Sequence, residues 1–204
     1  QCDMQFHIDN PKAICSLLKR QGESEPLVVC ASCFPPKEFF KACKPKPGNQ
    51  ESYGEMARAL YSPEGANLAL EKVVDVFLND RGILADPEEI ISETVGALYY
   101  EDGLALPISE IYSVMDDELG VGYTTQELVK CGASIDELAQ HLNSAEGMNM
   151  PFEDTAKTLI NYAVSECNSY KDVIASLAKL PAVKQDITND FLRSESIEEE
   201  PVKY

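Results

Sequence analysis

The sequence has few of the residues from which catalytic and nucleic-acid sites are built. It contains no Trp, only two His, and 17 Lys and Arg against 35 Asp and Glu, for a formal net charge of −18 over 204 residues. Nucleic-acid binding, or binding to an anionic membrane, requires a basic surface that this composition does not supply. There is no paired-histidine metal motif, nucleophile elbow or glycine-rich phosphate loop. We therefore expect no nucleic-acid partner, no common cofactor and no enzyme activity.

Long apolar runs are also missing. The longest nearly apolar stretch, residues 27–34, has eight residues, whereas a membrane-spanning helix needs about 20. We therefore expect no direct membrane span. With 44% hydrophobic residues, a chain of this length can bury one or two cores, which excludes wholesale disorder.

Helix start and stop signals predict an all-α fold, an irregular array of about 8–10 short helices. Ser62-Pro63-Glu64 and Asp86-Pro87-Glu88 each place a capping residue, a proline and an acid in the order of a helix start. A further helix is expected from about residue 107. Apolar stripes predict helices over residues 66–78, 90–98, 156–167 and 173–178. We find no convincing strand, and no fixed period that would indicate a solenoid.

Two patterns in the second half of the chain resemble capping boxes. Thr124 with Glu127, and Ser134 with Glu137, have the spacing in which a hydroxyl and a carboxylate satisfy each other's backbone amides. They predict two short successive helices, separated at residues 131–133. In the N-terminal region we expect helices over residues 11–19 and 35–42, whereas the short apolar pattern at residues 27–29 leaves open whether this piece is extended.

Cysteine and charge divide the chain at the same place. Five of the seven Cys lie in the first 43 residues, and residues 1–48 carry a net charge of +2, which leaves −20 for the remainder. Alternating Lys and Pro after residue 43 are typical of a linker or an extended strap. We therefore expect a small, basic, disulfide-stapled head (1–43), a Pro/Lys linker (44–52), an acidic helical body (53–193) and an acidic tail (194–204).

The same cysteines indicate a compartment. The chain begins with Gln1 rather than Met, as after signal-peptide removal, and its crowded Cys favour structural disulfides. We expect an extracellular, periplasmic or cell-surface location, with one thiol left over because the count is odd. All seven Cys are candidates for these disulfides: Cys2, Cys15, Cys30, Cys33, Cys43, Cys131 and Cys167.

Two alternatives use the head cysteines differently. Cys30 and Cys33 have the spacing of a zinc knuckle, and a zinc site would draw its ligands from His7, Cys15, Cys30, Cys33 and Cys43 in a reducing compartment. The same Cys30-x-x-Cys33 pair is the pattern of a thiol oxidoreductase, although no βαβ pattern surrounds it.

The sequence thus predicts an exported, disulfide-stabilised helical structural or interaction protein. We expect it to be a subunit or accessory of a larger extracellular or cell-envelope assembly, with a protein partner or a second copy of itself as its partner. Its basic head and acidic body are complementary in charge, which favours contact between them within one chain or between copies.

Overall fold

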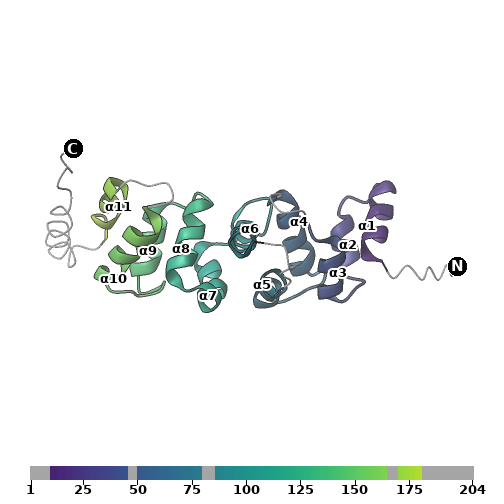
Figure 1. Ribbon diagram of the computed structural model, residues 1–204, viewed down its shortest axis with the longest axis horizontal. Coiled ribbons are helices and arrows are strands. Elements are labelled where there is room, and N and C mark those ends of the chain that lie inside the picture. Colours follow the sequence, from purple (N-terminus) through teal and green to yellow (C-terminus); the bar gives the residue numbers. More distant parts are fainter. Residues whose placement is uncertain (1–9, 46–49, 80–85, 165–169, 181–204) are drawn as a thin grey trace. The chain divides into compact units, whose positions relative to one another are not determined.

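A computed structural model describes residues 10–45, 50–79, 86–164 and 170–180, and over these residues it is entirely helical (Figure 1). Eleven α-helices and one π-helical segment are present in the described ranges, without a strand. The predicted all-α fold is confirmed. The helices are short, and none in the described part is long and apolar enough to cross a membrane.

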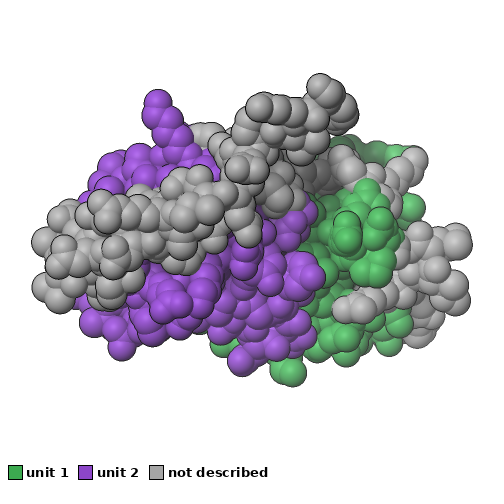
Figure 2. Space-filling model, turned by 60° about the vertical axis from the view of Figure 1, so that its left-hand side comes forward, with its two compact units in different colours: residues 1–115 green, residues 116–204 purple. Residues whose placement is uncertain are grey.

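The chain forms two compact units, residues 1–115 and 116–204, which Figure 2 colours separately. The division falls within α7, not at the predicted linker. Unit 1 contains α1 (Pro11–Arg20), α2 (Pro26–Ala31), α3 (Pro36–Cys43), α4 (Gln50–Tyr61), α5 (Leu70–Asn79), α6 (Pro87–Tyr99) and most of α7 (Ile108–Leu119). Unit 2 contains α8 (Val121–Lys130), α9 (Ile135–Asn143), α10 (Phe152–Thr158), the π-helical segment Leu159–Ala163 and α11 (Tyr170–Leu177).

The core of unit 1 includes side chains from both sides of the predicted linker. Phe39 and Phe40 of α3 are fully buried with Tyr53 of α4 and Phe77 of α5. The ring centroids of Phe40 and Phe77 are 5.0 Å apart, and those of Tyr53 and Phe77 are 6.0 Å apart, distances at which aromatic pairs stabilise a core. The cysteine-rich segment therefore packs as part of a larger helical unit.

In unit 2, α8 and the π-helical segment approach each other closely. A Cβ at Gly122 would lie 2.3 Å from the Tyr162 ring, so only glycine fits there without displacing that ring. Tyr162 also makes an edge contact with Tyr123, with ring centroids 5.6 Å apart. The extra residue of the π turn thus lies where these two helical elements meet.

One turn occurs three times in the chain. Residues 59–68, 97–106 and 141–150 align without a gap on a pattern of Leu at the second position, an acid at the sixth, Gly at the seventh and Leu or Met at the tenth. The first Leu of each copy is fully buried. The copies begin 38 and 44 residues apart, and this unequal spacing explains why a search for a fixed period finds nothing. The repeated leucines and glycines are Leu60, Leu98 and Leu142, and Gly65, Gly103 and Gly147.

The three turns also share their backbone hydrogen bonds. In the first, Ala66 N donates to Ala59 O and Leu68 N donates to Leu60 O, both at 2.9 Å. Equivalent bonds are made in the second and third turns at 2.7–3.0 Å. A Cβ on any of the three repeated glycines would lie 2.0 Å from the carbonyl oxygen of the turn's first residue. Glycine is therefore required there so that the chain can reach back to the end of the preceding helix.

This turn corrects one prediction. Ser62-Pro63-Glu64 does not begin a helix; it lies in the first repeated turn, after α4 has ended at Tyr61, and α5 begins only at Leu70. Serine and proline are turn residues as well as helix-start residues. These residues suit either a helix start or a turn. The turn forms because Ala59 O accepts a hydrogen bond from Ala66 N, and Ala59 belongs to α4, a helix that was not predicted.

The structure decides one open alternative and corrects one more expectation. Residues 27–29 are not extended but belong to α2, which packs against α1 and α4. Thr124 does not cap a helix, because α8 already begins at Val121 and the Thr124 hydroxyl donates to Gly120 O inside it. Ser134 does occupy the N-cap position of α9, but it makes no side-chain capping bond.

Several other helix predictions are confirmed, although the helix expected over 66–78 begins only at Leu70 and residues 165–167 of the one expected over 156–167 lie outside the described residues. Asp86 caps α6, with its carboxylate accepting from Glu88 N at 3.0 Å. The helices expected over residues 11–19, 35–42 and 173–178, and from about residue 107, correspond to α1, α3, α11 and α7, and the break at 131–133 separates α8 from α9. The predicted tail lies outside the described residues.

A prediction concerns the ninth position of the repeated turn, where φ is positive in all three copies: Asn67 (50°), Ala105 (51°) and Asn149 (49°). Asn tolerates this left-handed conformation better than Ala does. We expect A105N to raise the free energy of unfolding by about 0.5 kcal/mol, measured by urea unfolding followed by circular dichroism. The reverse change N67A should lower it by a similar amount. Destabilisation by A105N would contradict the equivalence of the three turns.

A second prediction concerns His141, which stands where the other two turns have Ala59 and Ala97. Burial lowers the pKa of His141 below its ordinary value of 6.5. Because the folded chain holds the imidazole neutral, the unfolded chain binds a proton more readily, and stability should fall as pH drops below about 6.5. We expect H141A to flatten the dependence of the urea midpoint on pH between about 5.5 and 7. An unchanged slope would contradict it.

Candidate functional site: a cluster of three thiols

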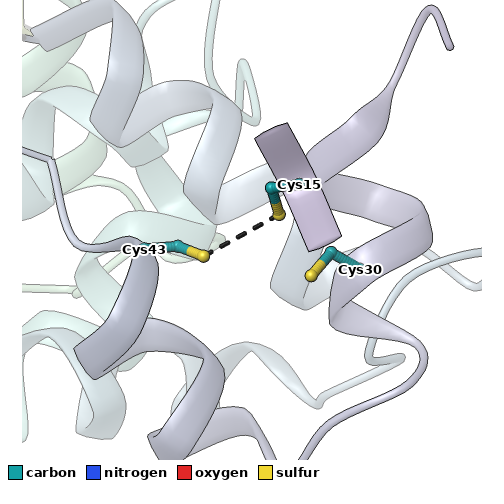
Figure 3. Close-up of side chains that lie close together, drawn as sticks. All are labelled: Cys15, Cys30 and Cys43. Carbon is teal, nitrogen blue, oxygen red and sulfur yellow. Dashed lines mark hydrogen bonds between the residues drawn. The ribbon is translucent and has the colours of Figure 1, made fainter. Parts of the chain in front are cut away.

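Three cysteine side chains from three helices meet in unit 1. The Sγ atoms of Cys15 (α1), Cys30 (α2) and Cys43 (α3) all lie within 4.8 Å of one another (Figure 3). Cys30 is completely buried, while Cys15 and Cys43 are half-buried. We call these three residues the thiol cluster. Among the described residues it is the only group of three or more metal-ligating side chains that converge in this way.

The first two helices place their cysteines by the same local pattern. Both α1 and α2 begin with proline and carry cysteine four residues later, as Pro11 to Cys15 and Pro26 to Cys30. Proline is favoured in the first turn because its fixed φ suits the helix and no amide is lost there. Asn10 caps α1 by accepting from Lys12 N at 3.1 Å.

Each of these two cysteines contacts the start of the other helix. Cys30 Sγ donates to Pro11 O at 3.2 Å, and Cys15 Sγ donates to Pro26 O at 3.7 Å. The paired contacts fix α1 beside α2 in a reciprocal arrangement. Cys43, the last residue of α3, closes the cluster, with its Sγ 3.8 Å from Cys15 Sγ.

The three thiols differ in their tendency to ionise. The hydrogen bond from Cys15 to Cys43, helped by the positive charge of Lys12, lowers the pKa of Cys43. The same hydrogen bond, together with burial, raises the pKa of Cys15, and burial raises the pKa of Cys30. Cys43 is therefore the sulfur on which a negative charge is best stabilised in the absence of any ion.

The structure does not bring the remaining candidates into this site. Cys33 is exposed and its Sγ donates to Val29 O at 3.4 Å, outside the cluster. Cys131 is buried in unit 2. Cys2, His7 and Cys167 lie outside the described residues. No two described Sγ atoms are at the separation of a disulfide bond, which is about 2.05 Å.

This geometry separates the two cysteines of the Cys-x-x-Cys pattern. Cys30 points into the cluster and Cys33 lies at the surface, so they are not paired as a knuckle or as a redox dithiol. The zinc and oxidoreductase alternatives both assume that Cys30 and Cys33 act together. The sequence signal that identifies the cluster instead is the repeated Pro-x-x-x-Cys spacing, which places two cysteines alike on two adjacent helices.

A cavity of about 400 Å³ lies beside the cluster. Cys15 is on its wall, together with Lys19 of α1 and Glu55 and Arg58 of α4. The cluster is therefore open to solvent on the side of Cys15, while Cys30 is closed off. Sequence analysis did not identify the α4 residues, because their helix was not predicted.

Comparison with protein-family models, curated proteins and solved structures finds no match for this chain. Its own residues therefore carry the argument about function.

A third prediction concerns thiol reactivity in the reduced, native chain. Cys33 is exposed and Cys30 is fully buried, and burial also keeps Cys30 protonated and unreactive. We expect iodoacetamide to modify Cys33 at least about 100-fold faster than Cys30, with peptide mass spectrometry to follow each site. In urea the two rates should converge. Equal rates in the native chain would contradict the placement of α2.

Proposed function

We propose that the chain is a structural or interaction protein that works as a subunit or accessory of a larger assembly. The observation that supports this is the turn repeated at residues 59–68, 97–106 and 141–150, each copy of which ends one helix and leads to the next. Stacked helical repeats commonly bind other proteins through extended surfaces. The partner class is therefore another protein or a second copy of this chain.

The charge distribution supports the same proposal. Residues 1–48 carry a net charge of +2 and the remainder −20, so one copy offers regions of opposite sign to another. Within unit 1, Lys37 of α3 and Asp75 of α5 form one such ion pair, with Nζ 3.8 Å from Oδ2. Other cations of the first helices, such as Arg20 at the end of α1, are exposed and can contact an acidic neighbour.

The redox state of the thiol cluster in the native protein indicates its compartment. Export stays a prediction from the sequence, and it is supported if Cys15 and Cys43, whose Sγ atoms are 3.8 Å apart, are bridged in the native protein. The alternative, a zinc-dependent binding module in a reducing compartment, requires all three thiols to be free. The presence of a third sulfur beside that pair favours the alternative, since a disulfide uses only two.

A fourth prediction tests self-assembly. Sedimentation equilibrium at about 20 mM and about 500 mM salt should show larger species at low salt, because added ions screen contacts between exposed charges. We expect R20E to raise the dissociation constant at low salt about 3- to 10-fold.

The matched control is K72E, which makes the same charge change at an exposed residue of α5. Lys72 lies outside residues 1–48, the basic segment, so K72E should weaken association less than R20E does. A monomer under all conditions would exclude self-assembly and leave a different protein as the partner. Equal effects of the two variants would contradict a role for the basic segment.

A further inference from the structure

The spacing of the thiol cluster matches a metal site. Zinc in a tetrahedral site has Zn–S bonds of about 2.3 Å, which places its sulfur ligands about 3.8 Å apart. Cys15 Sγ and Cys43 Sγ are 3.8 Å apart, and Cys30 Sγ is within 4.8 Å of both. These separations are far longer than a disulfide bond, and Figure 3 shows the three side chains reaching the same point from three helices.

We infer that Cys15, Cys30 and Cys43 of the reduced chain bind one Zn²⁺ ion as thiolates. Each thiol gives up its proton and forms one S–Zn bond, so three protons leave per ion bound and no electrons are transferred. The three thiolates and the ion together carry a single negative charge. A water molecule completes the fourth position, as in zinc sites with three protein ligands.

The ion must displace protons that are firmly held, because the hydrogen bond to Cys43 and burial raise the pKa of Cys15, and burial raises the pKa of Cys30. The backbone around the cluster nevertheless tolerates the exchange. Deprotonation removes the sulfur hydrogen bonds to Pro11 O and Pro26 O, but both carbonyls belong to the first residue of a helix and keep their bond from the amide four residues on. Lys12, whose charge already favours ionised Cys43, offsets the remaining negative charge. No buried polar group of the backbone is therefore left without a partner by metal binding.

Access to the site is provided by the adjacent cavity. It reaches Cys15, and its lining carries three acids (Glu23, Glu25 and Glu55) against the cations Lys19 and Arg58, so the path is only weakly acidic. Cys30 on the far side is completely buried, which keeps bulk water from that ligand once the ion is bound. An entry path is expected of a metal site, and the cavity supplies one at Cys15.

The metal site does not rest on the proposed role in an assembly, and its test uses no association measurement. The full-length chain, reduced with a phosphine and freed of metal, is titrated with Zn²⁺ against a chromophoric chelator. We expect one tightly bound ion per chain, with affinity that falls as pH is lowered because protons compete for the thiolates. Zn²⁺ should also slow iodoacetamide modification of Cys15, Cys30 and Cys43 together, and leave Cys33 unaffected.

Variants identify the ligands. Serine replacements C15S, C30S and C43S should each lower Zn²⁺ affinity more than about 100-fold, since the loss of residues that only support a ligand already costs 10- to 100-fold. The matched control C33S, at the nearby exposed cysteine, should leave the affinity unchanged. The protection experiment uses the unaltered chain, so the test still decides if a serine variant fails to fold.

Three results would overturn the inference. The first is the absence of tight Zn²⁺ binding by the reduced chain. The second is binding that protects cysteines other than these three. The third is a Zn²⁺ affinity of the reduced chain that C15S, C30S or C43S leaves unchanged. Failure of self-association in the sedimentation experiment leaves the metal inference intact, and failure of zinc binding leaves the assembly proposal intact.

Discussion

Three pairs of consecutive helices in this protein depend on the same two backbone hydrogen bonds. The turn between the helices donates both bonds to the end of the helix before it. Helix ends leave carbonyls without partners inside the helix, and here amides seven and eight residues further along satisfy them. The buried leucine at the second position of each turn and the glycine at the seventh allow the turn to approach the end of the preceding helix closely. Because these bonds are main-chain bonds, side chains at the other positions are free to differ, as His141 differs from Ala59 and Ala97.

The thiol cluster is a consequence of packing at a second level. Its cysteines come from three helices that contact one another, and α2 and α3 also pack against α4 and α5. Phe39 and Phe40 of α3 share a core with side chains of those two helices. The segment that seemed separable by charge and cysteine content is therefore stabilised by the acidic helices that follow it. A metal ion or a disulfide in the cluster would add to a fold that already has an apolar core.

Local signals in the sequence predicted those helices whose ends are decided by neighbouring residues. Asp86 and Pro87 begin α6, and Gly132, with φ of 87°, directly follows the C-cap residue of α8, as expected from residue type. The same kinds of signal misled at Ser62-Pro63-Glu64 and Thr124, because one residue type serves both turns and helix starts. At residues 27–29, an apolar β-branched run became helix because it packs between α1 and α4, and tertiary contacts of this kind outweigh weak local preference.

The sequence by itself determined the helical class, several helix boundaries and the repeated positions of leucine and glycine, since each depends on residues close together in the chain. Tertiary structure alone decided which cysteines meet. Cys33 is three residues from Cys30 and points elsewhere, whereas Cys43, 28 residues from Cys15, lies 3.8 Å from it. The physical reason is that helix direction and burial set where a side chain points, and spacing along the chain does so only within one helix.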